Sequence, residues 1–205
     1  VVPPGSENAY IQALGEELGS YVGDKLVKKY PLFVNGKQFT SETTSIPCGS
    51  GTASFDVTTS TLTLTNATIN TMGGNYGYGG AINSGLADLT IKLVGNNFIH
   101  AEHKDYWGDT YRDSINSSSN CNIKIVSGDT GGTPTLTCDV IDMGRGGSYN
   151  GGENAGNLMV DGVDLTVNDY VFVQHDITFQ NGAQVNVTGR LTANHNAVIT
   201  VEGEN

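Results

Sequence analysis

Apolar and polar residues alternate along much of the chain, and this alternation predicts short β-strands. In the stretch Ala81–Ile99, the apolar residues Leu89, Ile91 and Leu93 are separated by single polar residues. A period of two residues places the apolar side chains on one face of a strand and the polar side chains on the other. We therefore expect strands that bury one face and expose the other.

A second copy of this stretch follows it, beginning at Ser114. Ile82-Asn83-Ser84 returns 33 residues later as Ile115-Asn116-Ser117, and Ile91–Val94 returns 32 residues later as Ile123–Val126. A short strand that repeats at a nearly fixed interval, with polar segments between the copies, is typical of a β-solenoid. We therefore expect the two copies to stack on neighbouring coils, about 4.8 Å apart.

The strand pattern continues to the end of the chain and favours one fold class over two others. The strands are too short and too weakly hydrophobic for a buried α/β sheet, and turn dipeptides are too rare for a β-sandwich. The exception is Asn35-Gly36, which predicts a hairpin. Over residues 31–205 we expect an all-β fold, a single-stranded right-handed parallel β-helix.

Residues 1–30 follow a different pattern, which predicts a helix from Glu7 to Lys29. Ser6 suits the helix N-cap, and Pro31 prevents the helix from continuing. We expect this segment to be an α-helical cap that covers the open end of the β-helix; a helical connector between domains is the alternative. The apolar positions of the helix recur at spacings of three and four residues: Ile11, Leu14, Leu18, Val22 and Leu26.

The charge of the chain excludes one class of partner. Its 205 residues include 10 Lys and Arg against 21 Asp and Glu, a formal net charge of −11. Nucleic-acid binding needs a basic patch, so it is not expected. No apolar run approaches the roughly 20 residues of a membrane span. The first ten residues do not read as a signal peptide, so we take the chain as a mature or trimmed form of a secreted or cell-surface protein.

Three cysteines, Cys48, Cys121 and Cys138, are too few for a disulfide framework. Cys121 and Cys138 fall at inward positions of alternating strands, so we expect buried free thiols. A disulfide between these two residues stays open as an alternative, if their strands lie on adjacent coils.

Two segments near the start of the β region also carry a family resemblance. YPLFVNGKQFTS begins at Tyr30, and CGSGTASFDVTTSTLTLTNATI begins at Cys48. Together with Ile82–Ile99 they resemble secreted proteins of anaerobic, mostly clostridial bacteria, over roughly residues 30 to 170. That family is labelled carbohydrate-binding, and its fold is similar to the pectate-lyase-like β-helices. The resemblance implies Ca²⁺-assisted binding of plant cell-wall or acidic polysaccharide, but the matching motifs are strand and turn positions and carry no ligand-binding residue.

The segment 100–113, which separates the two copies, is the richest in chemically useful side chains. Sugar sites combine aromatic faces with charged or amide groups, and long loops within repeats are often functional. We also expect two lysines to lie side by side on adjacent coils, where they would contact uronate carboxylates. A pinned loop and solvated lysines are the structural alternative. The predicted ligand-binding residues are Trp107, Tyr106, Tyr111, Arg112, Lys92 and Lys124.

The same segment offers a candidate metal site. Asp105, Asp109 and Asp113 follow one another at intervals of four residues and, with loop carbonyls, could supply the oxygen ligands of Ca²⁺. Their spacing matches no EF-hand. Zn²⁺ bound by His100 and His103 is a weaker hypothesis, because a strand would place the two side chains on opposite faces.

Catalytic motifs are missing from the sequence. There is no GxSxG, HExxH or P-loop, and no catalytic residue is predicted. We therefore expect a non-catalytic, extracellular or cell-surface protein that binds a polysaccharide or a cell-surface glycan. The alternatives are a structural or adhesive surface solenoid and, by fold analogy alone, a polysaccharide lyase.

Overall fold

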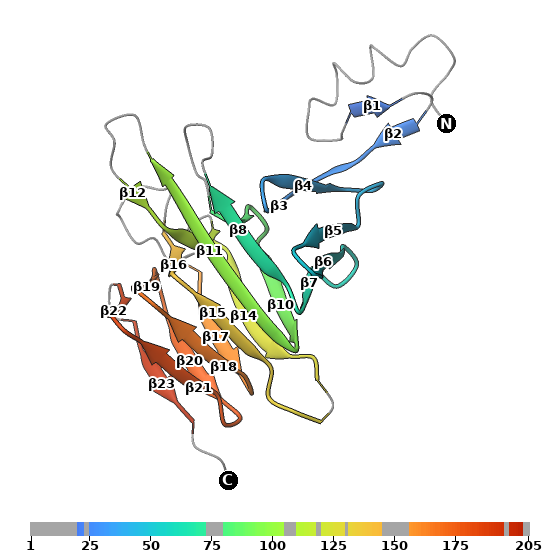
Figure 1. The fold of residues 1–205 in the computed structure, drawn as a ribbon. Coiled ribbons are helices and arrows are strands. Elements are labelled where there is room, and N and C mark those ends of the chain that lie inside the picture. The colour runs from blue at the N-terminus through green and yellow to red at the C-terminus, as the bar shows by residue number, and fades with distance from the viewer. Residues whose placement is uncertain are drawn as a thin grey trace.

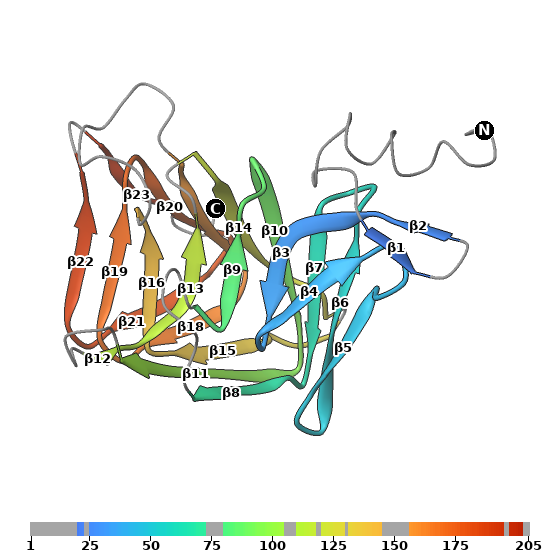
Figure 2. The same ribbon diagram turned by 90° about the horizontal axis from the view of Figure 1, so that it is seen from above.

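The computed structural model describes residues 20–22, 25–72, 80–104, 110–117, 120–129, 131–144, 156–194 and 197–202. These residues form 23 β-strands and no helix, so the all-β prediction is confirmed for them. Three long sheets run side by side through the molecule (Figures 1 and 2). Within this part of the chain, no helix has the length and apolar character needed to cross a membrane.

The chain passes through the three sheets in the same order five times. In each of these coils the first strand joins sheet I, the second joins sheet II and the third joins sheet III, and successive coils pair in parallel. The coils are β7 (Thr61–Thr65), β8 (Thr68–Met72) and β9 (Ile82–Ser84); β10 (Asp88–Val94), β11 (Asn96–Lys104) and β13 (Asp113–Ser117); β14 (Asn122–Ser127), β15 (Thr135–Cys138) and β16 (Val140–Met143); β17 (Leu158–Asp161), β18 (Asp164–Val167) and β19 (Tyr170–Val173); β20 (Ile177–Gln180), β21 (Gln184–Val187) and β22 (Arg190–Ala193), after which β23 (Ile199–Val201) returns to sheet I.

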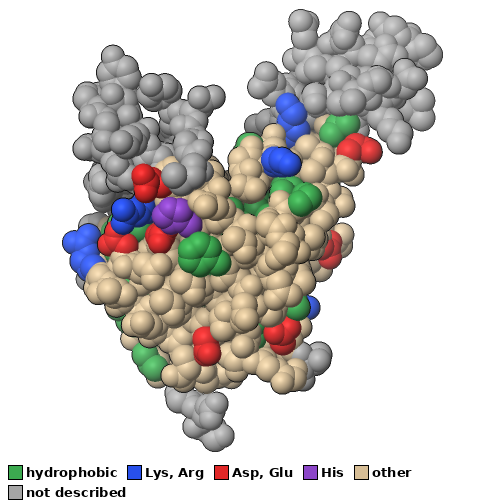
Figure 3. All heavy atoms as spheres, in the orientation of Figure 1, with side chains coloured by type: hydrophobic (Ala, Val, Ile, Leu, Met, Phe, Trp, Pro, Cys, Tyr) green, Lys and Arg blue, Asp and Glu red, His purple; other side chains and the backbone are tan. Residues whose placement is uncertain are grey.

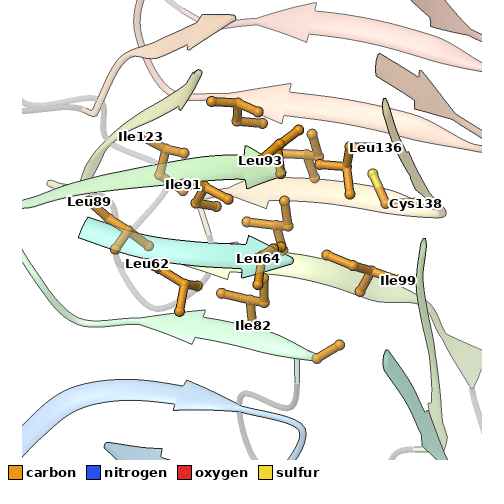
Figure 4. Packing of buried hydrophobic residues seen from close by; sticks show 14 of the residues in the cluster. Leu62, Leu64, Ile82, Leu89, Ile91, Leu93, Ile99, Ile123, Leu136 and Cys138 are labelled. Carbon is orange, nitrogen blue, oxygen red and sulfur yellow. The ribbon is translucent and has the colours of Figure 1, made fainter. Parts of the chain in front are cut away.

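The core lies inside the coils, where alternate residues of every sheet meet. In β7 the leucines are fully buried while the threonines between them are partly exposed. Figure 4 shows Leu62, Leu64, Leu89, Ile91 and Leu93 packed together in this interior. Burying such a side chain stabilises the fold by about 1.5–3 kcal/mol. The alternation read from the sequence therefore assigns the buried face correctly.

The two sequence copies stack on neighbouring coils, as predicted, but with one difference in register. Ile82 pairs with Ile115, the predicted offset of 33 residues. In sheet I, however, Leu89 pairs with Ile123, so the offset there is 34 rather than 32. A shift of two residues keeps every side chain on its own face, which is why the core tolerates it.

Antiparallel strands cover the N-terminal end of the coils. β6 (Gly51–Asp56) pairs with β7 in sheet I, and β3 (Lys29–Val34) pairs with β9 in sheet III. β5 (Ser45–Cys48) and β4 (Lys37–Thr40) extend these two sheets outward. The hairpin predicted at Asn35-Gly36 joins β3 to β4, and both turn residues have positive φ, 51° and 72°.

The predicted helical cap is wrong where it can be compared with the structure. β1 (Ser20–Val22) and β2 (Lys25–Val27) form an antiparallel pair within the segment expected to be helical. Residues 7–19 lie outside the described part of the chain. Gly23 disfavours a helix, and Tyr21, Val22 and Val27 favour strands. The strand edges of the first coil are covered by β3 and β6, not by a helix.

All three cysteines are free and buried, so the predicted thiols are confirmed and the disulfide alternative is wrong. Burial raises the pKa of Cys138 well above its ordinary value, and the neighbouring Asp139 carboxylate raises it further. Burial also raises the pKa of Cys121 and Cys48. None of the three is therefore a reactive thiolate.

Candidate functional site

The segment 100–113 is more regular than the sequence indicated. His100 to Lys104 complete β11, and Thr110–Tyr111 form β12, which pairs antiparallel with the end of β11. Tyr111 lies opposite His103 in this pair. Asp105, Tyr106, Trp107 and Asp109 lie outside the described residues. The predicted loop is therefore, in part, a strand extension that leads from sheet II into sheet III.

The two predicted lysines do not join this segment. Lys92 and Lys124 are exposed on the outer face of sheet I, whereas Arg112 lies between β12 and β13, at the corner of sheets II and III. The lysines are not directly opposite each other either: Lys124 pairs with Thr90, and Lys92 pairs with Val126. This register avoids the unfavourable pairing of like charges. The predicted set of six ligand-binding residues is therefore not one site.

The described part of the predicted metal site does not resemble a Ca²⁺ loop. Asp113 is the first residue of β13 and is 1% exposed. Among the residues that the structure describes, no three His, Cys, Asp or Glu side chains come together as a group that could hold a metal ion. The expected Ca²⁺ site therefore gains no support from Asp113.

An aromatic side chain that the sequence reading overlooked stands on the outer face of sheet II. Phe98, in β11, is 41% exposed, and its neighbours across the sheet are short polar side chains. Strand register places these side chains in one row that crosses five coils: Thr68, Phe98, Thr137, Thr166 and Asn186. The sheet thus presents a flat polar surface with one aromatic ring in it.

A second row, next to the first, contains a histidine held by an aspartate. His100 Nδ1 lies 2.5 Å from Asp139 Oδ2, and Asn168 Nδ2 donates to Asp139 Oδ1 at 3.2 Å. The backbone N–H of Asp139 donates to Ser114 Oγ at 2.9 Å, and Ser114 in turn donates to the carbonyl of Ile99. Three coils therefore fix the Asp139 carboxylate, which fixes the orientation of the imidazole.

These groups are brought together by the alternation of β11. Phe98, His100 and Glu102 occupy successive outward positions, about 6.6 Å apart along the strand. Ile99 and Ala101, between them, are buried in the core. One strand thus presents an aromatic ring, an imidazole and a carboxylate in a line.

Figure 3 shows this face of the molecule in the orientation of Figure 1. Neutral polar surface dominates it, and a histidine, acidic groups and basic groups gather at one edge, close to a hydrophobic side chain. In the described part of sheet II, the outward carboxylates are Glu102, Asp139 and Asp164, and no described outward side chain is a Lys or an Arg. The face is therefore acidic.

A group of buried polar residues lies around the corner, on the outer face of sheet III. Asn116 pairs with Asp142, and these residues are 1% and 7% exposed. Asp142 accepts a hydrogen bond from the backbone N–H of Gly144 at 3.1 Å. Burial closes this group to a polymer, while Phe98 and His100 on sheet II are open. Sheet II is therefore the better candidate for a binding surface.

One sequence signal could have located Phe98. Ile99 and Ala101 continue the inward alternation of the coil, so the residues between and before them must face outward. That parity puts an aromatic residue outside and a polar one, Asn97, inside, against the usual preference of both. Overall hydrophobicity conceals such an inversion, and the strand register reveals it.

Comparisons of the chain with protein-family models, with curated proteins and with solved structures find no match. The function is therefore argued from the geometry of the chain itself.

Proposed function

We propose that the chain is a non-catalytic, extracellular or cell-surface carbohydrate-binding protein, and that a polysaccharide lies along the outer face of sheet II. The observation that carries the proposal is Phe98, a 41% exposed ring on a flat face of threonine and asparagine side chains. The resemblance of Tyr30–Ile69 and Ile82–Ile99 to secreted clostridial carbohydrate-binding proteins supports it, and it also supports a right-handed parallel β-helix.

The chemistry of the face suits a sugar polymer. The C–H groups of a sugar ring pack on an aromatic face, and hydroxyl and amide side chains hydrogen-bond the sugar hydroxyls. Neighbouring strands in a parallel sheet are about 4.8 Å apart, so a chain that crosses the coils meets the same kind of side chain at each step. His100, oriented by Asp139, adds a polar group with a fixed direction beside the ring.

Ca²⁺ has no assigned step in this proposal, because the described residues do not supply a site for it. The resemblance implies Ca²⁺-assisted binding, so every binding assay compares buffer that contains Ca²⁺ with buffer that contains a chelator. A requirement for Ca²⁺ would place the ligands of the ion outside the residues described here.

A structural or adhesive solenoid is the second candidate, and ladders of side-chain hydrogen bonds between coils favour it. Asn157 Nδ2 donates to Asn122 Oδ1 at 3.0 Å, and Asn122 Nδ2 donates to Asp88 Oδ1 at 2.9 Å. Such ladders hold successive coils in register whether or not a ligand binds. This candidate predicts that no glycan binds.

A glycan array followed by titration of single variants tests the proposal. Phe98→Ala should weaken binding of the best array ligand by about 1–3 kcal/mol, because it removes the apolar platform. Phe33→Ala is the matched control: its ring is 38% exposed on the outer face of sheet III, and its loss should leave the affinity unchanged.

Three outcomes would count against the proposal. Equal affinities of Phe98→Ala and the unaltered protein would remove the site from sheet II. A loss confined to Trp107→Ala would move it to the segment 105–109. An array without any ligand, with and without Ca²⁺, would favour the structural solenoid.

A further inference from the structure

We infer that the sugar units bound beside Phe98 carry ammonium groups, so that the polymer is a polycationic amino-sugar glycan and not an acidic one. The inference rests on the proposed function and names the ligand class of the same surface. It follows from which hydrogen-bonding groups the surface presents and from their charge.

The first step concerns the histidine. An ionised carboxylate only accepts hydrogen bonds, so the contact between Asp139 and His100 Nδ1 requires the proton on Nδ1. In the neutral imidazole, Nε2 then carries a lone pair and accepts hydrogen bonds. The side chain of His100 is 29% exposed, so this acceptor can be reached from solvent.

The second step concerns the other polar groups around the ring. Glu102 adds a carboxylate at the next outward position of β11, and Asp164 adds one on β18. The amide of Asn168 is directed to Asp139 and is thereby occupied as a donor. Threonine hydroxyls both donate and accept, so they do not discriminate between ligands. The surface therefore offers mainly acceptors and negative charge.

The third step concerns charge over a longer range. The net charge of −11 attracts cations and repels a polyanion before contact is made. Two arginines, Arg112 and Arg190, lie exposed at the corner of sheets II and III, next to the exposed Asp169 and the buried Asp113 and Asp139. Acidic groups therefore outnumber basic ones at this edge as well. A uronate polymer would bring its carboxylates to a surface already rich in them.

Three hexasaccharides with different charges test the inference: glucosamine, N-acetylglucosamine and galacturonate hexamers, titrated at low and high salt. The glucosamine hexamer should bind about tenfold or more tightly than the neutral N-acetylated hexamer, and this advantage should shrink in high salt. Glu102→Gln should reduce the advantage several-fold. Glu42→Gln, which removes one charge from an exposed turn far along the chain, should not.

The possible failures are distinguishable. Equal, Phe98-dependent binding of the neutral and the cationic hexamers would overturn the inference and leave the proposed function standing. Tightest binding of the galacturonate hexamer, with or without Ca²⁺, would do the same. Binding of hexalysine as tightly as the glucosamine hexamer, unaffected by Phe98→Ala, would show attraction to charge alone and would also overturn it. If no hexasaccharide bound at all, both proposals would fail.

Discussion

At the scale of single residues, parity along the strand decides the environment of a side chain more than its chemical type does. Asn97 points inward and is 3% exposed, while the adjacent Phe98 points outward. The buried amide is tolerated because all its hydrogen bonds are satisfied: Oδ1 accepts from the backbone of Ala67, and Nδ2 donates to three carbonyls. The exposed ring forms no such network, which is why a binding role accounts for it better than a structural one.

A prediction at this scale concerns the thiol of Cys138. Its pKa is raised in the folded protein above the ordinary value of 9.0, because burial disfavours the thiolate. Above pH 9 the unfolded chain loses this proton and the folded chain keeps it, so the stabilising contribution is present at lower pH and is lost as pH rises. The free energy of unfolding should fall by up to about 1.4 kcal/mol per pH unit more steeply than in Cys138→Ala. Urea unfolding across this pH range measures it, and parallel curves would refute it.

At the scale of the elements, the strands with clean alternation were predictable and the irregular ones were not. The hairpin at Asn35-Gly36 and the paired copies after Ala81 follow from local chemistry, since turn residues and two-residue periodicity report directly on backbone conformation. The extension of β11 to Lys104 depends on pairing with β8 and β12, which are distant or weak in the sequence. The helical spacing of Leu18, Val22 and Leu26 misled because spacing alone does not count what strand pairing contributes.

The turn between sheets I and II gives a prediction for these elements. Asn97→Ala should lower the free energy of unfolding by about 2–3 kcal/mol, because it leaves the buried N–H of Ala67 without its acceptor and frees three carbonyls. Asn96→Ala is the matched control. This exposed neighbour accepts from Thr135 Oγ1 at 3.1 Å, and its loss should cost less than about 1 kcal/mol. Equal losses in urea unfolding would show that the buried amide has no special role.

At the scale of the whole molecule, stacked coils place the interior and the binding surface on opposite sides of the same strands. The interior needs only apolar residues at every second position, so the outer faces are free to vary. Sheet I exposes Lys92 and Lys124, whereas sheet II exposes Phe98 and carboxylates. The sequence therefore predicted the solenoid from its interior. It did not predict the candidate site, since neighbours on an outer face come from different coils and their register depends on the length of each turn.

Backbone amide shifts during titration with the glucosamine hexamer test the central claim, that a glycan lies on sheet II, most directly. The account predicts that the perturbed resonances map to the outward row around Phe98: Thr68, His100, Thr137 and Thr166. Resonances of Lys92 and Lys124 on sheet I, and of Phe33 on sheet III, should stay in place. Shifts confined to sheet I or sheet III, with sheet II unaffected, would contradict the account.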